Sequence, residues 1–136
     1  MIICADDYGM SASIDDAVIK LVQNNRLTAI SCIINGQNAK NSTSKLKEYI
    51  GKIDIGLHLL LTDGKPLSNQ KADGGLVDHN GNLISFWKLT TKTYSKRIQL
   101  GSACNEIRAQ IERFNDLFGR MPDLLTGINM YSSCHL

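Results

Sequence analysis

The sequence predicts an α/β protein in which parallel strands alternate with helices. Three short apolar segments are separated by two segments whose apolar residues recur at helical spacing. The order strand, helix, strand, helix, strand builds right-handed β-α-β units and therefore a parallel sheet. The chain has 136 residues, of which 43% are hydrophobic and 21% are charged. This length and composition suit a single folded domain over residues 1–136.

Each element follows from its local sequence. Strands are expected at residues 2–5 (IICA, buried), 27–34 (LTAISCII, ending at Asn35–Gly36) and 53–61 (IDIGLHLLL). The first helix begins near Ser13, which forms a capping box with Asp16, and ends near Asn24. A second helix is expected over residues 39–50.

The amino-acid composition changes after residue 62. Residues 62–100 begin with a stretch rich in Gly, Asn and Asp that predicts a long irregular loop, and such loops in compact domains usually serve a site. A third helix, which is strongly amphipathic, then ends at Gly119. Its apolar face consists of Cys104, Ile107, Ile111, Phe114 and Phe118. A final strand is expected after residue 123, although LLTGINMYSSCHL is a poor strand sequence.

Charge and cysteine content exclude several classes of protein. The formal net charge of +2 offers no electrostatic footprint for nucleic acid or anionic lipid. No apolar run approaches the ~20 residues that cross a bilayer, and no signal peptide is evident. The four cysteines form no C-x-x-C pair, and three lie in apolar segments, which favours reduced core thiols and a cytoplasmic protein; they are Cys4, Cys32, Cys104 and Cys134.

Candidate chemistry gathers at the ends of two predicted strands. Asp6 and Asp7 follow the first strand, and His58 lies late in the third, on the face opposite the odd-numbered apolar residues. Ligands bind parallel α/β folds at the carboxyl ends of strands, and carboxylates with an imidazole suit a divalent metal ion. We therefore expect Asp6, Asp7 and His58 to converge at one rim of the sheet.

The same residues also have possible roles that involve no metal ion. An Asp pair after a strand also accepts hydrogen bonds from the free amides at a helix entry. A histidine in an apolar strand is often a core residue with a carbonyl partner, and His79 suits a turn. A receiver-type signalling domain that binds Mg²⁺ through an acidic pair is a further alternative, but its acceptor Asp belongs at the end of the third strand, whereas Asp54 lies near the start.

Three segments in order carry a resemblance to a known family. ADDYGMS, LTAISCIING and IGLHLLLTDGKPLS, with LVDHNGNL and EIRAQIERFNDLFGRMPD, resemble the YdjC-like carbohydrate deacetylases over residues 1 to about 123. The resemblance implies an irregular (β/α) barrel with its site at the C-terminal rim. It also implies metal-dependent deacetylation of N-acetylated sugars such as chitooligosaccharides. In that reaction Asp6 is the general base, and Asp7 and His58 hold a divalent ion, Mg²⁺ or Zn²⁺.

The chain departs from the family pattern after residue 123. The family carries its third ligand in a P-x-x-x-D-G-H-x-H-V motif, whereas this chain reads LLTGINMYSSCHL, with His135 out of register. The resemblance therefore predicts the N-terminal portion of a barrel with impaired activity, or a non-catalytic truncated fragment. An unfinished barrel exposes a strand edge, which favours association, so a homodimer is one expected assembly.

We hypothesise that residues 127–131 are the family motif in another reading frame. One permitted codon set for this stretch, moved back by one base, encodes His-Gln-His-Val at the family spacing from Pro122. The nucleotide sequence around codons 122–131 tests this hypothesis. A shifted frame without His-x-His, or with an early stop codon, would exclude it.

Overall fold

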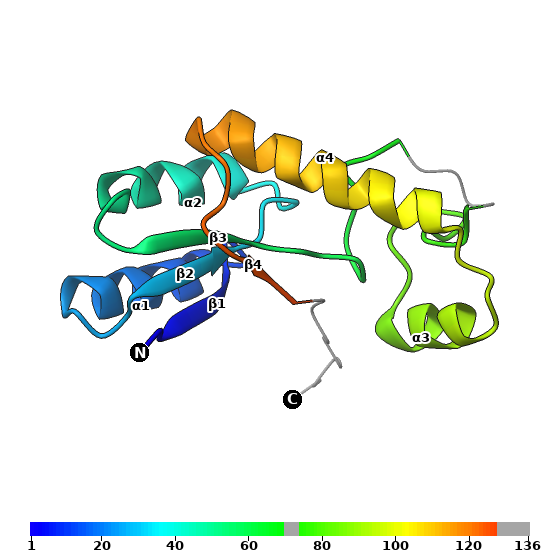
Figure 1. The fold of residues 1–136 in the computed structure, drawn as a ribbon, viewed down its shortest axis with the longest axis horizontal. Coiled ribbons are helices and arrows are strands. Elements are labelled where there is room, and N and C mark those ends of the chain that lie inside the picture. The colour runs from blue at the N-terminus through cyan, green and yellow to red at the C-terminus, as the bar shows by residue number, and fades with distance from the viewer. Residues whose placement is uncertain (70–73, 128–136) are drawn as a thin grey trace.

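The computed structural model describes residues 1–69 and 74–127. One four-stranded sheet has the order β1-β2-β3-β4, and all of its neighbouring strands are parallel (Figure 1). Its strands are β1 (Cys4–Tyr8), β2 (Ala29–Cys32), β3 (Asp54–His58) and β4 (Leu125–Thr126). The helices are α1 (Ala12–Gln23), α2 (Ala39–Leu46), the 3-10 turn η1 (Lys47–Tyr49), α3 (Phe86–Tyr94) and α4 (Leu100–Phe118). The α/β prediction is confirmed, and the arrangement is that of part of a (β/α) barrel.

Strand parity divides the sheet into an apolar face and a polar face. On β2 and β3 the apolar face carries Ile30, Cys32, Ile55 and Leu57, which pack in one core cluster with buried residues of α1, α2 and α4. The alternate residues, among them His58, point to the other face because side chains alternate along a strand. The predicted separation of His58 from the odd-numbered apolar residues of β3 is therefore confirmed.

Several predicted strand and helix boundaries shift. The first strand begins at Cys4 rather than residue 2, and Ile2 and Ile3 are 71% and 41% exposed because β1 is an edge strand. The third strand ends at His58 rather than residue 61. The helix expected over residues 39–50 ends at Leu46 and tightens into η1.

The predicted capping box of α1 is wrong. The helix begins at Ala12, so Ser11 is its N-cap, and the Ser11 hydroxyl accepts a hydrogen bond from the Ile14 amide at 3.3 Å. Asp16 instead forms an exposed ion pair with Lys45, 2.9 Å from its ammonium nitrogen. The Ser13 hydroxyl lies 3.1 Å from that of Ser11, beside the cap rather than at it.

The segment after β3 is more ordered than expected. The prediction of an irregular loop over residues 62–100 is wrong for residues 86–94, which form α3. A second apolar cluster, separate from the main core, consists of Leu61, Leu76, Val77, Leu83, Ile84 and Leu89. In the parts of the chain that the structure describes, no helix is long and apolar enough to span a bilayer.

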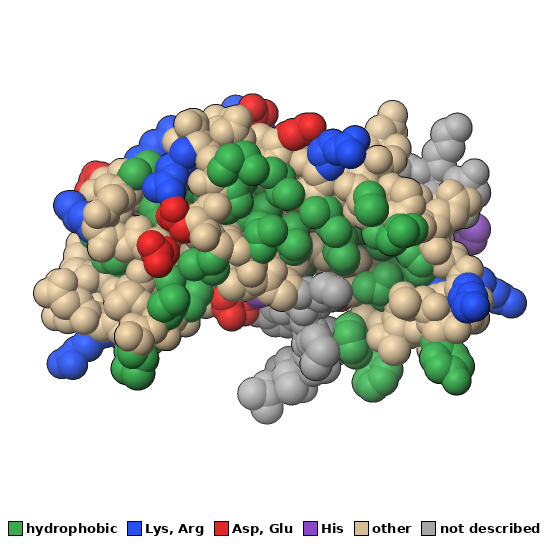
Figure 2. Space-filling model, in the orientation of Figure 1, with side chains coloured by type: hydrophobic (Ala, Val, Ile, Leu, Met, Phe, Trp, Pro, Cys, Tyr) green, Lys and Arg blue, Asp and Glu red, His purple; other side chains and the backbone are tan. Residues whose placement is uncertain are grey.

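The cysteines and α4 differ from the predicted apolar pattern. The thiols of Cys4, Cys32 and Cys104 are free as expected, but only Cys32 is buried; Cys134 lies outside the described residues. The buried face of α4 consists of Glu106, Gln110, Phe114, Leu117 and Phe118, two of them polar. On the face in Figure 2, hydrophobic side chains gather across the middle and charged ones are scattered around them.

Replacing Gly56 with alanine should loosen the contact between β3 and the chain that leads into β4. A Cβ at Gly56 would lie 2.5 Å from Leu124 Cγ and 2.7 Å from the Leu124 carbonyl oxygen. We expect Gly56→Ala to lower the free energy of unfolding by about 1–3 kcal/mol in urea titrations. Gly101→Ala is the control, because a Cβ there meets nothing within 4 Å. Equal unfolding midpoints for the two variants would contradict the close approach.

Candidate active site

Asp6, Asp7 and His58 meet at the carboxyl ends of β1 and β3. An Asp6 carboxylate oxygen lies 3.8 Å from His58 Nδ1, and an Asp7 carboxylate oxygen lies 3.6 Å from His58 Nε2. The predicted convergence of these residues is confirmed. The side chains of Asp6 and Asp7 are 53% and 30% exposed, whereas His58 is buried. The site therefore has a buried imidazole behind two carboxylates that solvent reaches.

A bulge in β1 explains how two consecutive carboxylates approach one ring. The pairing of β1 with β2 shifts register between Ala5 and Tyr8, and Asp7 has a φ of 64°. In a regular strand, consecutive side chains point to opposite faces, but a residue in the left-handed region turns its side chain out of that alternation. Asp tolerates this conformation better than most residues. Sequence parity alone could not have placed both carboxylates beside His58.

The His58 imidazole is oriented from β4. Its Nδ1 lies 3.0 Å from the Thr126 hydroxyl, which is also in hydrogen-bond contact with the Ser31 hydroxyl. Its buried Nε2 has no hydrogen-bond partner among the described residues. In the tautomer that carries its proton on Nδ1, Thr126 accepts that proton and the lone pair of Nε2 lies on the side of Asp7. Thr126 and Ser31 were not singled out from the sequence.

This donor set fits a divalent metal ion. The 3.6 Å between His58 Nε2 and the Asp7 oxygen exceeds a normal hydrogen bond, yet two ligands about 2 Å from one ion can lie this far apart. Imidazole nitrogen and carboxylate oxygen are ligands of Zn²⁺, and carboxylate oxygen is a ligand of Mg²⁺. Within residues 1–69 and 74–127, no group of three or more His, Cys, Asp or Glu side chains forms a metal cluster.

Cys4 adjoins the acidic pair without adding a ligand. Its thiol lies 3.8 Å from an Asp6 carboxylate oxygen. Partial desolvation of the thiol, together with the negative charge of Asp6, raises the pKa of Cys4 to about 11. The thiol is therefore protonated at neutral pH, and a protonated thiol is a poor metal ligand and nucleophile.

A buried carboxylate on α1 fixes the turn that follows the acidic pair. Asp15 accepts a hydrogen bond from the Gly9 amide at 2.7 Å and another from the Ser42 hydroxyl at 2.5 Å. Tyr8 donates to the Ser42 carbonyl at 2.9 Å, and burial raises the pKa of its phenol. Gly9 has a φ of 92°, and a Cβ there would lie 2.4 Å from the Ile33 carbonyl oxygen. The turn beyond Asp7 is thus held against α1, α2 and the end of β2.

A buried carboxylate on α4 fixes the segment that follows His58. Glu106 accepts hydrogen bonds from the Leu67 and Ser68 amides at 3.0 and 2.9 Å and from the Ser68 hydroxyl at 2.5 Å. The Gln110 side chain donates to Glu106 at 2.8 Å and also pairs with both the amide and the carbonyl of Leu60. Glu106 and Gln110 were not singled out from the sequence, because polar residues of an amphipathic helix usually face solvent.

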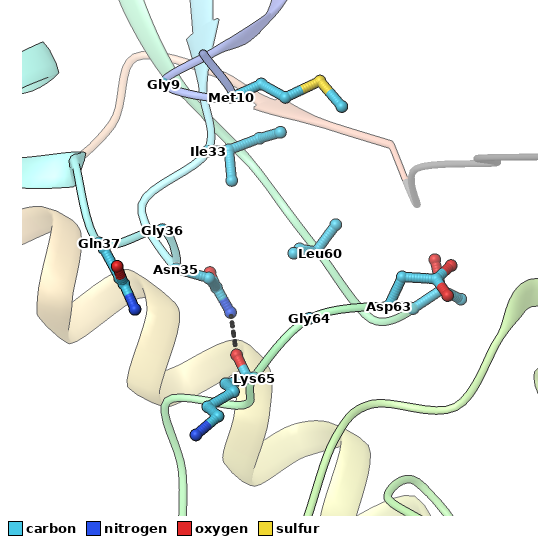
Figure 3. A pocket seen from close by; sticks show the side chains of 11 residues that line it. Gly9, Met10, Ile33, Asn35, Gly36, Gln37, Leu60, Asp63, Gly64 and Lys65 are labelled. Atoms are coloured by element: carbon cyan, nitrogen blue, oxygen red, sulfur yellow. Dashed lines mark hydrogen bonds between the residues drawn. The ribbon is translucent and has the colours of Figure 1, made fainter. Parts of the chain in front are cut away.

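A pocket opens between the turns that follow β1, β2 and β3. Its volume is ≈ 430 Å³. Figure 3 shows its lining, which combines apolar, polar and glycine residues: Gly9, Met10, Ile33, Asn35, Gly36, Gln37, Leu60, Thr62, Asp63, Gly64 and Lys65. Gly9 lies two residues after Asp7, and Leu60 lies two residues after His58. The same strands therefore supply the acid–imidazole group and the pocket walls.

The other residues considered from the sequence do not join this site in the described structure. His79 is exposed in a turn, as expected, and His135 lies outside the described residues. Asp54 is the first residue of β3, and the strand ends at His58, so the acceptor aspartate of a receiver-type domain is absent from the end of β3.

The fold and site define an α/β protein whose carboxylates and imidazole gather at the carboxyl ends of parallel strands. The chain belongs to the YdjC-like family, whose sequence model, described as YdjC-like protein, matches residues 1–127. The resemblance read from the motifs is therefore confirmed.

Named relatives are carbohydrate deacetylases. The chitooligosaccharide deacetylase of Serratia marcescens is 32% identical over 136 residues, which are 100% of this chain and 50% of the relative. The carbohydrate deacetylase of Clostridium beijerinckii is 31% identical over 122 residues, 90% of this chain and 46% of the relative. The chain thus spans about half the length of these curated relatives.

A solved structure shares the fold. A protein of Enterococcus faecalis, named for the cleavage of cellobiose phosphate, matches with a TM-score of 0.76 and 25% identity. The match covers 91% of this chain and 46% of that one. It supports the assignment of the sheet and its helices to part of a barrel.

Replacing Glu106 with glutamine should destabilise the segment after His58. The amide would turn N–H groups toward donors that now share one carboxylate. We expect Glu106→Gln to lower the free energy of unfolding by about 1.5–3 kcal/mol. Glu112→Gln, on an exposed position of the same helix, should change it by less than about 0.5 kcal/mol. Urea unfolding followed by circular dichroism measures both, and an unchanged midpoint for Glu106→Gln would contradict the role of this carboxylate.

Proposed function

We propose that the chain carries the metal-binding and proton-transfer residues of a carbohydrate deacetylase that acts on N-acetylated sugars. The observation that carries the proposal is the buried Nε2 of His58, which lies 3.6 Å from the Asp7 carboxylate and beside that of Asp6. The names of the family relatives support the substrate class. The reaction is hydrolysis of the C–N bond of a linear amide, with acetate and an amino sugar as products.

Asp7 and His58 would hold the divalent ion, Zn²⁺ or Mg²⁺. When bound, such an ion lowers the pKa of a water molecule and polarises the acetamide carbonyl. Because Nδ1 of His58 is occupied by Thr126, the ring presents Nε2 as its metal-binding atom.

Asp6 is suited to move the proton. Its carboxylate is 53% exposed and adjoins the imidazole of His58. As water attacks the acetamide carbon, the Asp6 carboxylate would take the proton of that water. The same proton can then pass to the departing nitrogen, so that the C–N bond breaks with formation of a neutral amine.

The residues after 127 limit the expected activity. Two protein ligands come from β1 and β3, whereas the position of the third family ligand lies outside the described residues and carries no matching histidine. We infer weak metal binding and slow turnover, because an incomplete ligand set lowers both affinity and rate. The alternative function is that of a non-catalytic fragment, which binds the sugar without hydrolysing it.

Replacing Asp7 and Asp6 separately should split metal binding from proton transfer. We expect Asp7→Asn to weaken Zn²⁺ binding by about 10–100-fold in a chelator competition assay, because it removes a charged ligand. Asp6→Asn should keep most of the metal affinity but abolish acetate release from N,N′-diacetylchitobiose. Asp54→Asn, an exposed carboxylate at the opposite end of β3, is the matched control and should change neither property.

The Serratia marcescens enzyme serves as the reference for turnover. Acetate release by this chain at the rate of that enzyme would contradict the inferred impairment. Zn²⁺ and Mg²⁺ binding that is the same in Asp7→Asn and the unmodified chain would contradict the metal site itself.

A further inference from the structure

We propose that the pocket between the turns that follow β1, β2 and β3 binds the ring of the N-acetylated sugar, and that Asn35 Oδ1 accepts a hydrogen bond from it. The donor is an O–H or N–H group of the sugar. This inference rests on the proposed function and names a specificity-determining residue for it. Asn35 ends the segment after β2 and lines the pocket (Figure 3).

The lining of the pocket suits a sugar ring. Met10, Ile33 and Leu60 provide apolar surface, while Asn35 and Asp63 provide polar groups. A pyranose has C–H groups on its faces and hydroxyl groups around its edge, so it matches a lining of both kinds. A volume of ≈ 430 Å³ lies within the range of small-molecule sites. The glycines at positions 9, 36 and 64 leave space where side chains would otherwise fill it.

The orientation of the Asn35 amide is fixed by two acceptors. Its Nδ2 donates to the Lys65 carbonyl at 3.4 Å and to a Glu106 carboxylate oxygen at 3.3 Å. A flipped amide would place its oxygen against both of these acceptors, so the hydrogen bonds decide the assignment. Figure 3 shows the nitrogen turned to Lys65 and the oxygen turned away from it.

The oxygen of this amide is left without a partner. Asn35 Oδ1 is buried and accepts no hydrogen bond from the described residues. Buried acceptors are nearly always paired in folded proteins, so an unpaired one in a pocket wall indicates a ligand that supplies the donor. A purely structural role as a helix cap does not account for it, because the N-cap of α2 is Asn38.

The surrounding turn can admit the ligand. Gly36 and Gln37, which follow Asn35, are exposed and line the same pocket. Because Asn35 Oδ1 is buried, this turn would have to move for the sugar to reach the oxygen, while the hydrogen bond to Glu106 on α4 would hold the amide nitrogen. The acceptor is thus held in one orientation before the sugar arrives, which favours recognition of a donor over an acceptor at that point.

The test measures sugar binding by the metal-free chain. N-acetylglucosamine and N,N′-diacetylchitobiose are titrated in the presence of EDTA, with calorimetry or ligand-observed NMR as the readout. We expect Asn35→Leu to weaken binding about tenfold, the loss of one buried hydrogen bond. Asn41→Leu, the same substitution at an exposed position of α2 that does not line the pocket, is the matched control and should change binding less than about twofold.

Two further measurements test the inference without relying on the folding of the variant. If Asn35→Leu fails to fold, the side-chain NH₂ resonances of Asn35 are followed in the unmodified chain, where the sugar should shift them. Glucosamine and 2-deoxyglucose then distinguish an N–H donor from a hydroxyl donor. Binding that Asn35→Leu leaves unchanged, or unshifted Asn35 resonances at saturating sugar, would overturn the inference. Asn35-dependent binding by a chain that releases no acetate at all when Zn²⁺ is added in excess would instead overturn the proposed catalysis alone.

Discussion

The carboxylate of Glu106 is the interaction on which the site architecture depends. It is fully buried, and the donors that surround it come from the turn after β2, the segment after β3 and α4 itself. Burying a carboxylate costs free energy unless hydrogen bonds replace its hydration, and here amide and hydroxyl donors do so. Because two chain segments converge on one charge, α4 positions both pocket walls, and the hydrogen bond from Asn35 to the Lys65 carbonyl joins them directly.

The acidic pair poses the opposite problem, that of neighbouring like charges. The bulge in β1 and the left-handed Asp7 direct the carboxylates to different nitrogens of one imidazole, so each has a separate polar neighbour. The polar face of β3 needs small neighbours for this arrangement. Gly56 leaves room for the backbone at Leu124, and the chain then reaches Thr126 beside His58. The site is therefore assembled from backbone irregularities on otherwise regular strands.

The sequence was sufficient for the features that depend on periodicity. The parallel order of strands and the opposite faces of Ile55 and His58 follow from residue spacing, and the convergence of Asp6 and His58 follows from the polarity of parallel strands. The bulge at Asp7 depends on pairing with a distant strand, and the burial of Glu106 depends on which segment packs over α4. Neither has a local signature, since an isolated glutamate in an amphipathic helix usually faces solvent.

The shortness of β4 has a dynamic consequence for the histidine. Within residues 1–69 and 74–127, β4 consists of Leu125 and Thr126 and lies at the edge of the sheet, and such short edges open by local fluctuation more readily than central strands. Whenever β4 detaches, His58 Nδ1 loses its hydroxyl partner and the ring is released to rotate. A ligand that requires the oriented ring binds only the attached state, so part of its binding free energy is used to hold β4 in place. Amide protection at the end of the sheet and occupancy of the site are thus thermodynamically linked.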